Sequence, residues 1–434
     1  MGNTLQDGIF YDKNQKAGNS FAGIFLRVSK SSTADEIGTT LKELWSMYED
    51  LRNGIQSDLK EVNEKHRYSG NLDVLIGYSA RIFSVKGCRR QVPVGLDDDA
   101  FSQPFVGGGG PIVKDSSILY SNDIRINHVT SEHIFLQFIG DNTLTVTRAI
   151  VETWKLLSKF KDIDDDFILS ISKCYEGFQR NDGRSWLGFH DGVSNVPSRE
   201  RLKTIAISNQ GLSPNDLWTT NGTYLCFMRI MIDLFKWQSV EKEAQELIIG
   251  RDKISGCPII GKDMKGKPIK APNCPIRGTF EVIERGNEMF RDYLPSPNSY
   301  QIDSSNSDLN LSHIARAKIL TRPYQVGNSK IYRQGFEFFE STDLFPGFNV
   351  GLNFISYQNT TSKLFRILQK GFSRKNPSDK EFKSFEDYFT VRAAGIFLVP
   401  PKEQDELFPG MSIFLDINKT IPKSYEFRKS RYIN

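Results

Sequence analysis

The clearest secondary-structure signal in the chain lies in residues 21–66, which have the sequence FAGIFLRVSKSSTADEIGTTLKELWSMYEDLRNGIQSDLKEVNEKH. The apolar run at 21–28 is typical of a buried strand. From Asp35 to His66 apolar residues recur at steps of three or four, which indicates one stripe of a long amphipathic helix. That stripe contains Ile37, Leu41, Leu44, Tyr48, Leu51, Ile55, Leu59 and Val62. The stretch therefore predicts a strand followed by a helix.

The rest of the first half continues the alternation of strands and helices. Strand-like stretches occur at Leu72 to Val85 and at Asp123 to Val129. Helical spacing returns from Leu144 to Phe160, and Phe167 to Ser172 has the character of another strand. The resulting order, β-α-β-β-α-β, is the split βαβ pattern of a ferredoxin-like unit.

The second half follows the same order more loosely, which indicates a structural duplication without an obvious sequence repeat. Its predicted elements are a strand at 223–233, a helix through Trp237 and Ile248, strands at 318–321, 331–338 and 351–357, a helix at 361–370 and a strand at 395–399. We therefore predict an α+β fold with an N-terminal ferredoxin-like unit at 1–215 and a C-terminal unit at 216–434. Two long irregular regions, 181–216 and 255–311, are rich in Gly, Ser, Asn and Pro, and loops of that length are often functional.

Composition excludes several classes of protein. The 434 residues, 38% of them hydrophobic, are enough for two domains with substantial cores. No stretch approaches the ~20 apolar residues that span a bilayer, and the N-terminus lacks the features of a signal peptide, so we predict a cytoplasmic protein that does not bind membranes. The net charge of +4 is dispersed, which argues against nucleic-acid binding. Five widely spaced cysteines favour reduced thiols.

A short segment between the two halves has unusual backbone freedom. It has the sequence SWLGFHDGVSNVP at 185–197, in which Gly188, Gly192 and Asn195 surround Asp191. Such a backbone can pass close to a flat ligand while the carboxylate projects from it. From spacing alone, a functional Asp191 and an ordinary turn with a capping aspartate are equally well supported.

The segment G-F-H-D-G at 188–192 resembles the G-x-x-D-G signature of the dye-decolorizing peroxidases, a family of haem enzymes, and Asn195 matches the asparagine that usually follows. Further segments resemble the family in the same order, so the similarity covers about positions 70 to 401. They are LDVLIGYSARIF (72–83), NGTYLCFMRIMIDLFKW (221–237), GRDKISGCPI (250–259), SHIARA (312–317), IYRQGFEF (331–338), GLNFISYQ (351–358) and GIFLVPP (395–401). The Gln-Gly pair after Arg333 is similar to the longer-chain branch. The resemblance implies two ferredoxin-like units in a barrel-like α+β arrangement.

The resemblance also implies roles for three residues. His313 matches the proximal ligand of the haem iron, while Asp191 and Arg333 match the distal positions. A carboxylate can move a proton between the two oxygens of peroxide, and a guanidinium can bind the peroxide anion and stabilise charge as the O–O bond breaks. Asp387 is the candidate acid that orients His313; Glu386 is a close second, and a plain surface acid is equally well supported.

Other positions match the lining of the family's haem pocket. Leu352 and Phe354 alternate on a strand and match its distal side. Phe189, Val193 and Asn195 are expected near the haem edge, and Arg316 is expected to reach a propionate. The predicted residues of the haem pocket are therefore Phe189, Val193, Asn195, Arg316, Leu352 and Phe354. The chain departs from its relatives at Ala315, where a basic residue is common, which weakens the expectation of propionate anchoring. Val193 stands where threonine is frequent.

The function that the resemblance implies is a haem b peroxidase that reduces hydrogen peroxide and oxidises organic donors such as phenols and anthraquinone-type dyes. Bulky dyes require electron transfer from surface aromatic residues, for which the candidates are Tyr332, Tyr357, Tyr388 and Trp237. The alternative is a haem carrier without turnover, in which His313 would serve equally well but Asp191 and Arg333 would have no purpose. A homo-oligomer is possible, because family members often assemble.

Overall fold

The computed structural model describes residues 5–12, 18–56, 61–96, 127–128, 132–191, 195–270, 309, 312–314, 330–341, 347–364 and 385–416. The strands of the first half are β1 (Ser20–Val28), β2 (Asp73–Tyr78), β3 (Asn127–His128), β4 (Ile134–Gly140) and β5 (Leu169–Phe178). Those of the second half are β6 (Thr223–Ile232), β7 (Ile259–Lys262), β8 (Pro268–Lys270), β9 (Tyr332–Ser341), β10 (Phe348–Gln358) and β11 (Phe389–Val399). The α-helices are α1 (Ala34–Arg52), α2 (Thr143–Leu157), α3 (Ser198–Ile205), α4 (Leu234–Gln238) and α5 (Lys242–Ile249).

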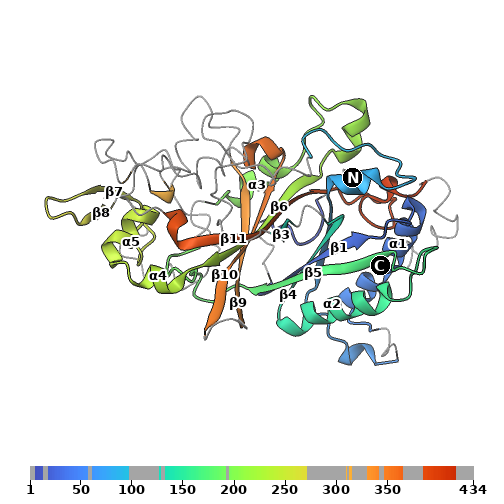
Figure 1. Ribbon diagram of the computed structural model, residues 1–434, viewed down its shortest axis with the longest axis horizontal. Helices are drawn as coiled ribbons and strands as arrows, with labels where there is room; N and C mark the ends of the chain where they lie inside the picture. The colour runs from blue at the N-terminus through green and yellow to red at the C-terminus, as the bar shows by residue number, and fades with distance from the viewer. Residues whose placement is uncertain are drawn as a thin grey trace.

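Two four-stranded antiparallel sheets form the centre of the molecule (Figure 1). The N-terminal sheet has the order β2-β4-β1-β5, and the C-terminal sheet has the order β9-β10-β6-β11. In each sheet the second strand of its unit lies at one edge, followed by the third, the first and the fourth, which is the ferredoxin-like order. The prediction of a ferredoxin-like α+β fold is therefore confirmed, while the duplication and the unit boundaries stay predictions.

The two sheets join at both edges and close into a barrel. Strand β5 pairs with β9 through Phe178 and Glu337, and β2 pairs with β11 through Tyr78 and Leu398. Each join has a single paired register position, whereas the ladders within a unit run over six or more positions. The units are thus individually well paired and meet along two thin seams.

Aromatic side chains fill the barrel interior. Every strand of the barrel contributes to one cluster, which includes Phe21, Phe25, Leu75, Phe135, Leu225, Phe227, Phe336, Tyr357 and Phe397, with Tyr175 of β5 packed against it. Phe25 contacts Phe135 and Phe227 at ring-centroid distances of 4.9 and 5.2 Å. Phenylalanine rings therefore make up a large part of the barrel core.

Helices α1 and α2 cover the outer face of the N-terminal sheet (Figure 1). The apolar stripe of α1 contributes Ile37, Leu41, Leu44 and Tyr48 to this outer core. The helix begins with a capping box between Thr33 and Glu36, and it ends at Arg52 because Gly54 adopts a left-handed conformation (φ 70°). The prediction that this helix continues to His66 was therefore wrong, and Glu64–His66 form a separate 3₁₀ turn.

The third strand of the N-terminal unit is β4, which the sequence prediction missed. The described part of the predicted strand at 123–129 is limited to β3, a two-residue strand that pairs in parallel with β11. Strand β4 is buried along its whole length, so its sequence, IFLQFIG, lacks the alternation that marks a half-exposed strand. Because β4 lies between β2 and β1, it supplies the pairing that the ferredoxin-like order requires.

In the second half, β6, β9, β10 and β11 confirm four predicted strands with adjusted ends. The predicted helix through Trp237 and Ile248 is divided into α4 and α5, because Ser239 and Val240 form a turn. The predicted strand at 318–321 lies outside the described residues, as does most of the predicted helix at 361–370, of which residues 361–364 are helical.

The cysteine prediction needs one correction. Cys88, Cys174 and Cys226 are free, but Cys257 is disulfide-bonded, with its partner outside the described residues. Folding brings together cysteines that sequence spacing separates, so wide spacing alone does not exclude a bond.

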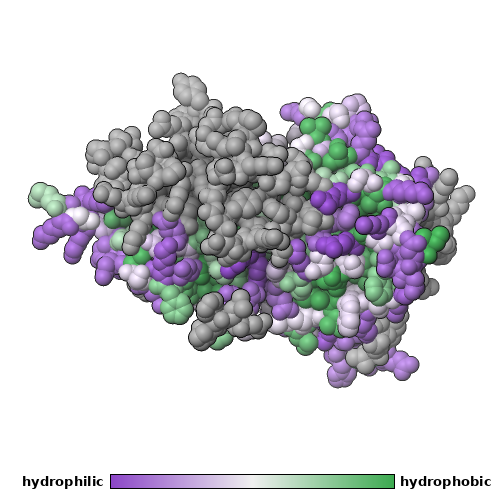
Figure 2. All heavy atoms as spheres, in the orientation of Figure 1, coloured by the Kyte–Doolittle hydropathy of each residue, from purple (hydrophilic) through white to green (hydrophobic). Residues whose placement is uncertain are grey.

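One face of the molecule is mixed in hydropathy (Figure 2). On the face seen in Figure 2, hydrophilic side chains alternate with small hydrophobic patches over the coloured surface. Within the described ranges, no helix combines the length and the apolar character that crossing a bilayer requires.

Candidate active site

The loop at 180–191 is tied down by two arginines. Arg180 donates to both carboxylate oxygens of Asp182, at 3.0 and 2.6 Å. Arg184 donates to the backbone carbonyls of Gly188, Lys253 and Ile254 at 2.8, 2.7 and 3.1 Å. These bonds fasten the loop to the segment after α5, so that Asp191, whose N–H donates to Gly183, sits on a fixed backbone.

Gly188 is required where the loop meets that segment. Its φ of 85° lies in the left-handed region, and a Cβ at this position would be 2.5 Å from Cε of Lys253. A side chain would therefore meet both backbone strain and a steric clash. This accounts for the first glycine of the G-x-x-D-G segment in physical terms.

The carboxylate of Asp191 lies over strand β9 at Gly335. A Cβ on Gly335 would be 2.8 Å from Oδ2 of Asp191 and 3.1 Å from Cδ1 of Leu352. Side chains alternate along β9, and Tyr332 and Phe336 point into the barrel. Arg333, Gly335 and Glu337 therefore face outward, on the side where Asp191 lies.

Asn195 holds the backbone of Arg333. Its Nδ2 donates to the carbonyl of Arg333 at 2.6 Å, and its Oδ1 accepts from the Arg333 N–H at 3.0 Å. The amide thus pairs with β9 in the manner of a neighbouring strand. Arg333 is half-buried, and burial lowers the pKa of its guanidinium while the charge of Asp191 opposes that shift.

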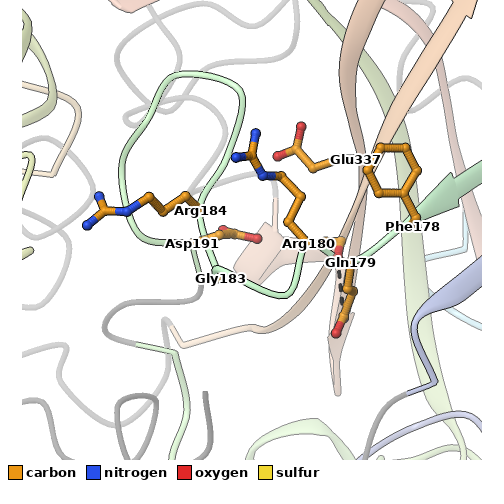
Figure 3. Close-up of a pocket in the computed structure, with 8 residues that line it drawn as sticks. Phe178, Gln179, Arg180, Gly183, Arg184, Asp191 and Glu337 are labelled. Carbon is orange, nitrogen blue, oxygen red and sulfur yellow. Dashed lines mark hydrogen bonds between the residues drawn. The ribbon is translucent and has the colours of Figure 1, made fainter. Parts of the chain in front are cut away.

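A small polar pocket, partly open to solvent, lies where the loop meets the seam between β5 and β9 (Figure 3). Its lining consists of Phe178, Gln179, Arg180, Gly183, Arg184, Asp191, Gly335 and Glu337. The carboxyl groups of Asp191 and Glu337 enter it from the loop and from the strand. Burial and the charge of Asp191 raise the pKa of Glu337 to about 9.

Arg251 is a second buried arginine close to this site. It follows α5, is 5% exposed and donates to the carbonyl of Gly256 at 2.7 Å. Burial, together with the positive charge of Arg333, lowers the pKa of Arg251 to about 9. Two positively charged guanidinium groups therefore lie close enough to influence each other.

His313 lies beside the outer face of the C-terminal sheet. Its ring contacts that of Phe385 at a centroid distance of 4.7 Å, and Phe385 contacts Phe389 at 4.9 Å. Phe385 packs against the apolar cluster on this face, which contains Met228, Ile230, Phe354, Phe389 and Val391. His313, Asp191 and Arg333 are thus all placed on the same side of one sheet.

Asp387, the predicted partner of His313, lies in the 3₁₀ turn Phe385–Tyr388. It stands two residues after Phe385, whose ring contacts the imidazole, and its backbone carbonyl accepts from Nζ of Lys236 at 2.8 Å. The role of its carboxylate remains a prediction.

The other predicted pocket residues divide into three groups. Leu352 and Phe354 face outward on β10, where they pair with Glu337 and Gly335. Phe189 packs in a separate apolar cluster with Trp237, at a ring distance of 6.3 Å. Val193 and Arg316 lie outside the described residues.

The proposed surface relay was wrong for all four of its aromatic candidates. Tyr332, Tyr357, Tyr388 and Trp237 are at most 3% exposed because they belong to apolar cores. The half-buried indole of Trp186 lies closer to solvent, between Arg180 and Phe339. It donates to the carbonyl of Phe338 at 3.0 Å.

Sequence reasoning gave no role to Glu337 or Arg251. Both stood inside segments that were quoted for their resemblance, IYRQGFEF and GRDKISGCPI. Charged residues at strand and loop positions are usually solvated, so neither carried a distinguishing signal. His190 is buried, with Nε2 3.2 Å from the carbonyl of Ile254 and a pKa lowered by burial to about 4.

Comparisons with known proteins identify a family and a shared fold. The family model described as "Dyp-type peroxidase, C-terminal" matches residues 182–404. The dye-decolorizing peroxidase of Brevibacterium linens is 27% identical over 130 residues, which are 28% of this chain and 32% of that protein. The match therefore spans about a third of the length of this curated relative.

Solved structures of low identity share the fold over nearly the whole chain. Ferric DtpA from Streptomyces lividans aligns with a TM-score of 0.65 at 18% identity, covering 94% of this chain and 97% of that one. A DyP-type peroxidase from Cellulomonas bogoriensis aligns with the same TM-score and identity, covering 93% and 95%.

Proposed function

Because the chain belongs to the Dyp-type peroxidase family, we propose that it is a haem-dependent peroxidase that reduces hydrogen peroxide and oxidises organic donors. The observation that carries the proposal is the position of Asp191 and Arg333 on the outer face of the sheet beside which His313 lies. In this proposal the N-terminal unit, residues 1–215, brings the loop with Asp191, and the C-terminal unit, residues 216–434, holds the haem.

The residues present suit a haem group. An imidazole is a common axial ligand of haem iron, and the buried cluster around Phe354 and Phe389 supplies the apolar surroundings that a flat macrocycle needs. Gly335 keeps the space beneath Asp191 free of a side chain. His313 would hold haem b through its iron, and Arg251 and Arg333 supply positive charge that suits propionates or a peroxide anion. When bound, haem supplies the redox chemistry of peroxide reduction.

The chain's own groups handle the proton and the charge. The carboxylate of Asp191 accepts a proton from one peroxide oxygen and returns it to the other, which leaves as water; such general acid–base catalysis contributes ~10²–10⁴-fold in rate. Arg333 binds the peroxide anion through a fixed fork of donors and stabilises the charge that develops as the bond breaks. Asn195 positions Arg333 by holding its backbone on both sides.

Bulky donors are oxidised at the surface in this proposal, and phenols and anthraquinone-type dyes are the predicted donor classes. Trp186 replaces the four buried candidates, since its half-buried ring adjoins Phe339, which is 50% exposed. Replacing Trp186 with phenylalanine should lower the turnover of an anthraquinone dye more than that of a small phenol. Equal losses for both donors would contradict this route.

An absorption spectrum tests the function directly. The purified protein reconstituted with haem should show a Soret band that changes on addition of one equivalent of hydrogen peroxide. A stable, unchanged band would instead favour the haem carrier, and the lack of any Soret band would contradict both functions. His313→Ala should lose the band of the ligated iron.

Variants of the distal groups test the assignment of roles. Asp191→Asn keeps the shape and removes the base, and Arg333→Leu removes the charge; each should slow the peroxide-dependent change by ~10²-fold or more. Lys262→Leu, on the short strand β7, serves as a matched control for loss of a positive charge. Wild-type rates in both distal variants would refute the roles of Asp191 and Arg333.

A further inference from the structure

Glu337 is a buried acid without an obvious structural purpose. Its side chain is 4% exposed, and neither carboxyl oxygen makes a hydrogen bond of normal geometry to any group in the described part of the chain, although the nearby backbone N–H of Trp186 favours the charged form. A buried carboxyl group in that condition costs stability, because the solvation of its oxygens is lost and not replaced. Retaining it on the strand that carries Arg333 points to a task in the site.

The surroundings of Glu337 connect it with both Asp191 and solvent. It shares the lining of the open polar pocket with Asp191, and both lie on the outer face of β9 (Figure 3). Its neighbours across the ladders are Leu352 on β10 and Phe178 on β5, which are apolar. The pocket that the two acids share is lined mainly by polar side chains of the loop, with Phe178 as its apolar wall.

The charged groups that face Glu337 come mainly from the loop. Asp191 and Asp182 disfavour a second negative charge, while Arg180 favours it. Arg184 also lines the pocket, and Arg333 extends from the same face of β9. Burial is the largest influence and the charge of Asp191 is the next, so the pKa of Glu337 is raised to about 9 despite Arg180.

The reaction creates a demand for protons at this place. Conversion of one hydrogen peroxide to two waters consumes two electrons and two protons. Donors oxidised at the protein surface release their protons there, outside the buried site. Protons must therefore enter from solvent each time electrons arrive, and the partly open pocket that Asp191 and Glu337 both line is a route for them.

We infer that Glu337 is a second distal acid, which stays protonated beside the carboxylate of Asp191 and passes protons to it from the solvent-facing pocket. In each transfer the O–H bond of Glu337 breaks and an O–H bond forms on Asp191. Glu337 then regains a proton from water in the pocket, so the number of protons is conserved. The relay rests on the proposed peroxidase function, whereas the protonated state of Glu337 does not.

Infrared difference spectroscopy tests the protonated state independently of activity. The haem-loaded wild-type protein at pH 7 should show the carbonyl band of a buried protonated carboxylic acid, which shifts in D₂O. The band should disappear in Glu337→Gln and persist in Glu176→Gln, which removes an exposed acid from neighbouring β5. A wild-type spectrum without the band, or a band that survives in Glu337→Gln, would overturn the inference.

Stopped-flow absorption tests the relay. After reaction with one equivalent of peroxide, the return of the Soret band on addition of an organic donor should be at least about tenfold slower in Glu337→Gln at pH 7, and Glu337→Asp should restore part of the rate. The wild-type rate should fall as pH rises through about 9, where Glu337 loses its proton, and Glu337→Gln should lack this fall.

The outcomes separate the relay from the function. A wild-type protein that reacts with peroxide, with an equal return rate and pH profile in Glu337→Gln, would overturn the relay and leave the peroxidase intact. If Glu337 had a purely structural role, the return of the Soret band should be as slow in Glu337→Asp as in Glu337→Gln. The return rate of both variants should then still fall at alkaline pH. A wild-type protein that does not react with peroxide would overturn the proposed function and the relay together, and the infrared band alone would then report the buried acid.

Discussion

Replacing Glu337 with glutamine removes a titrating group from the seam between the two sheets while keeping its size and hydrogen-bonding shape. In the folded protein the pKa of Glu337 is raised to about 9 from an ordinary value of 4.5, chiefly by burial and then by the charge of Asp191. Unfolding releases the side chain to water and restores its ordinary pKa. The stability of the wild-type protein must therefore depend on pH through this group.

The sign follows from the raised pKa. Folding favours the protonated form, so the contribution of Glu337 to the free energy of unfolding is fully present below pH 4.5 and is lost as the pH rises toward 9. Each pH unit within this window removes ~1.4 kcal/mol, so between pH 5 and pH 7 the loss is on the order of 3 kcal/mol. Glutamine does not ionise and keeps its contribution at every pH.

Urea unfolding followed by tryptophan fluorescence measures this difference at pH 5, 6, 7 and 8. The free energy of unfolding of Glu337→Gln minus that of the wild type should increase by on the order of 3 kcal/mol from pH 5 to pH 7. Glu176→Gln, which replaces an exposed acid on β5, should give a nearly constant difference. A constant difference for Glu337→Gln as well would refute the raised pKa and the burial argument behind it.

Two further substitutions test the geometry around the distal groups. Gly335→Ala places a Cβ 2.8 Å from Oδ2 of Asp191 and should displace the carboxylate. The peroxide-dependent Soret change should therefore be slower by about tenfold or more. Gly261→Ala is the control and should not slow this change, because no atom would lie closer than 3.7 Å to its Cβ. Asn195→Ala removes both hydrogen bonds to the backbone of Arg333 and should lower the free energy of unfolding by ~1–3 kcal/mol, measured in urea, while also slowing the peroxide step. Unchanged peroxide rates in Gly335→Ala, or unchanged stability in Asn195→Ala, would contradict these contacts.

The fold was predictable where local patterns are unambiguous. The apolar stripe of α1 predicts a helix, and the alternating residues of β9 and β10 predict strands. Strand β4 was missed because a strand covered on both faces lacks the alternation of apolar and polar residues by which periodicity identifies a strand. The end of α1 was missed because the apolar stripe continues past Gly54, where a left-handed backbone ends the helix regardless of pattern.

Only those site residues that lie in a recognisable sequence motif could be predicted. Asp191 and Arg333 were found from their segments, whereas Glu337 in GFEFFE has the alternation of a strand with one solvated face. Its burial depends on the closing of the barrel, which brings the loop at 180–191 across the outer face of β9. Contacts of that kind join residues about 160 positions apart, as in the pair Phe178 and Glu337, and local sequence patterns do not predict them.

The position of the site at a seam has a physical reason. Within a sheet, the outer face is covered by its own helices or by apolar packing, as α1 and α2 cover the N-terminal sheet. At the join of β5 and β9 the pairing is reduced to a single position, so the chain leaving β5 at Phe178 is free to cross over the neighbouring sheet. That crossing brings Asp191 from one unit onto the strand that holds Arg333 and Glu337 in the other. A fold of two units thereby gains a place for buried charges without interrupting the core of either unit, because the barrel interior remains apolar and the acids occupy the outside of the seam.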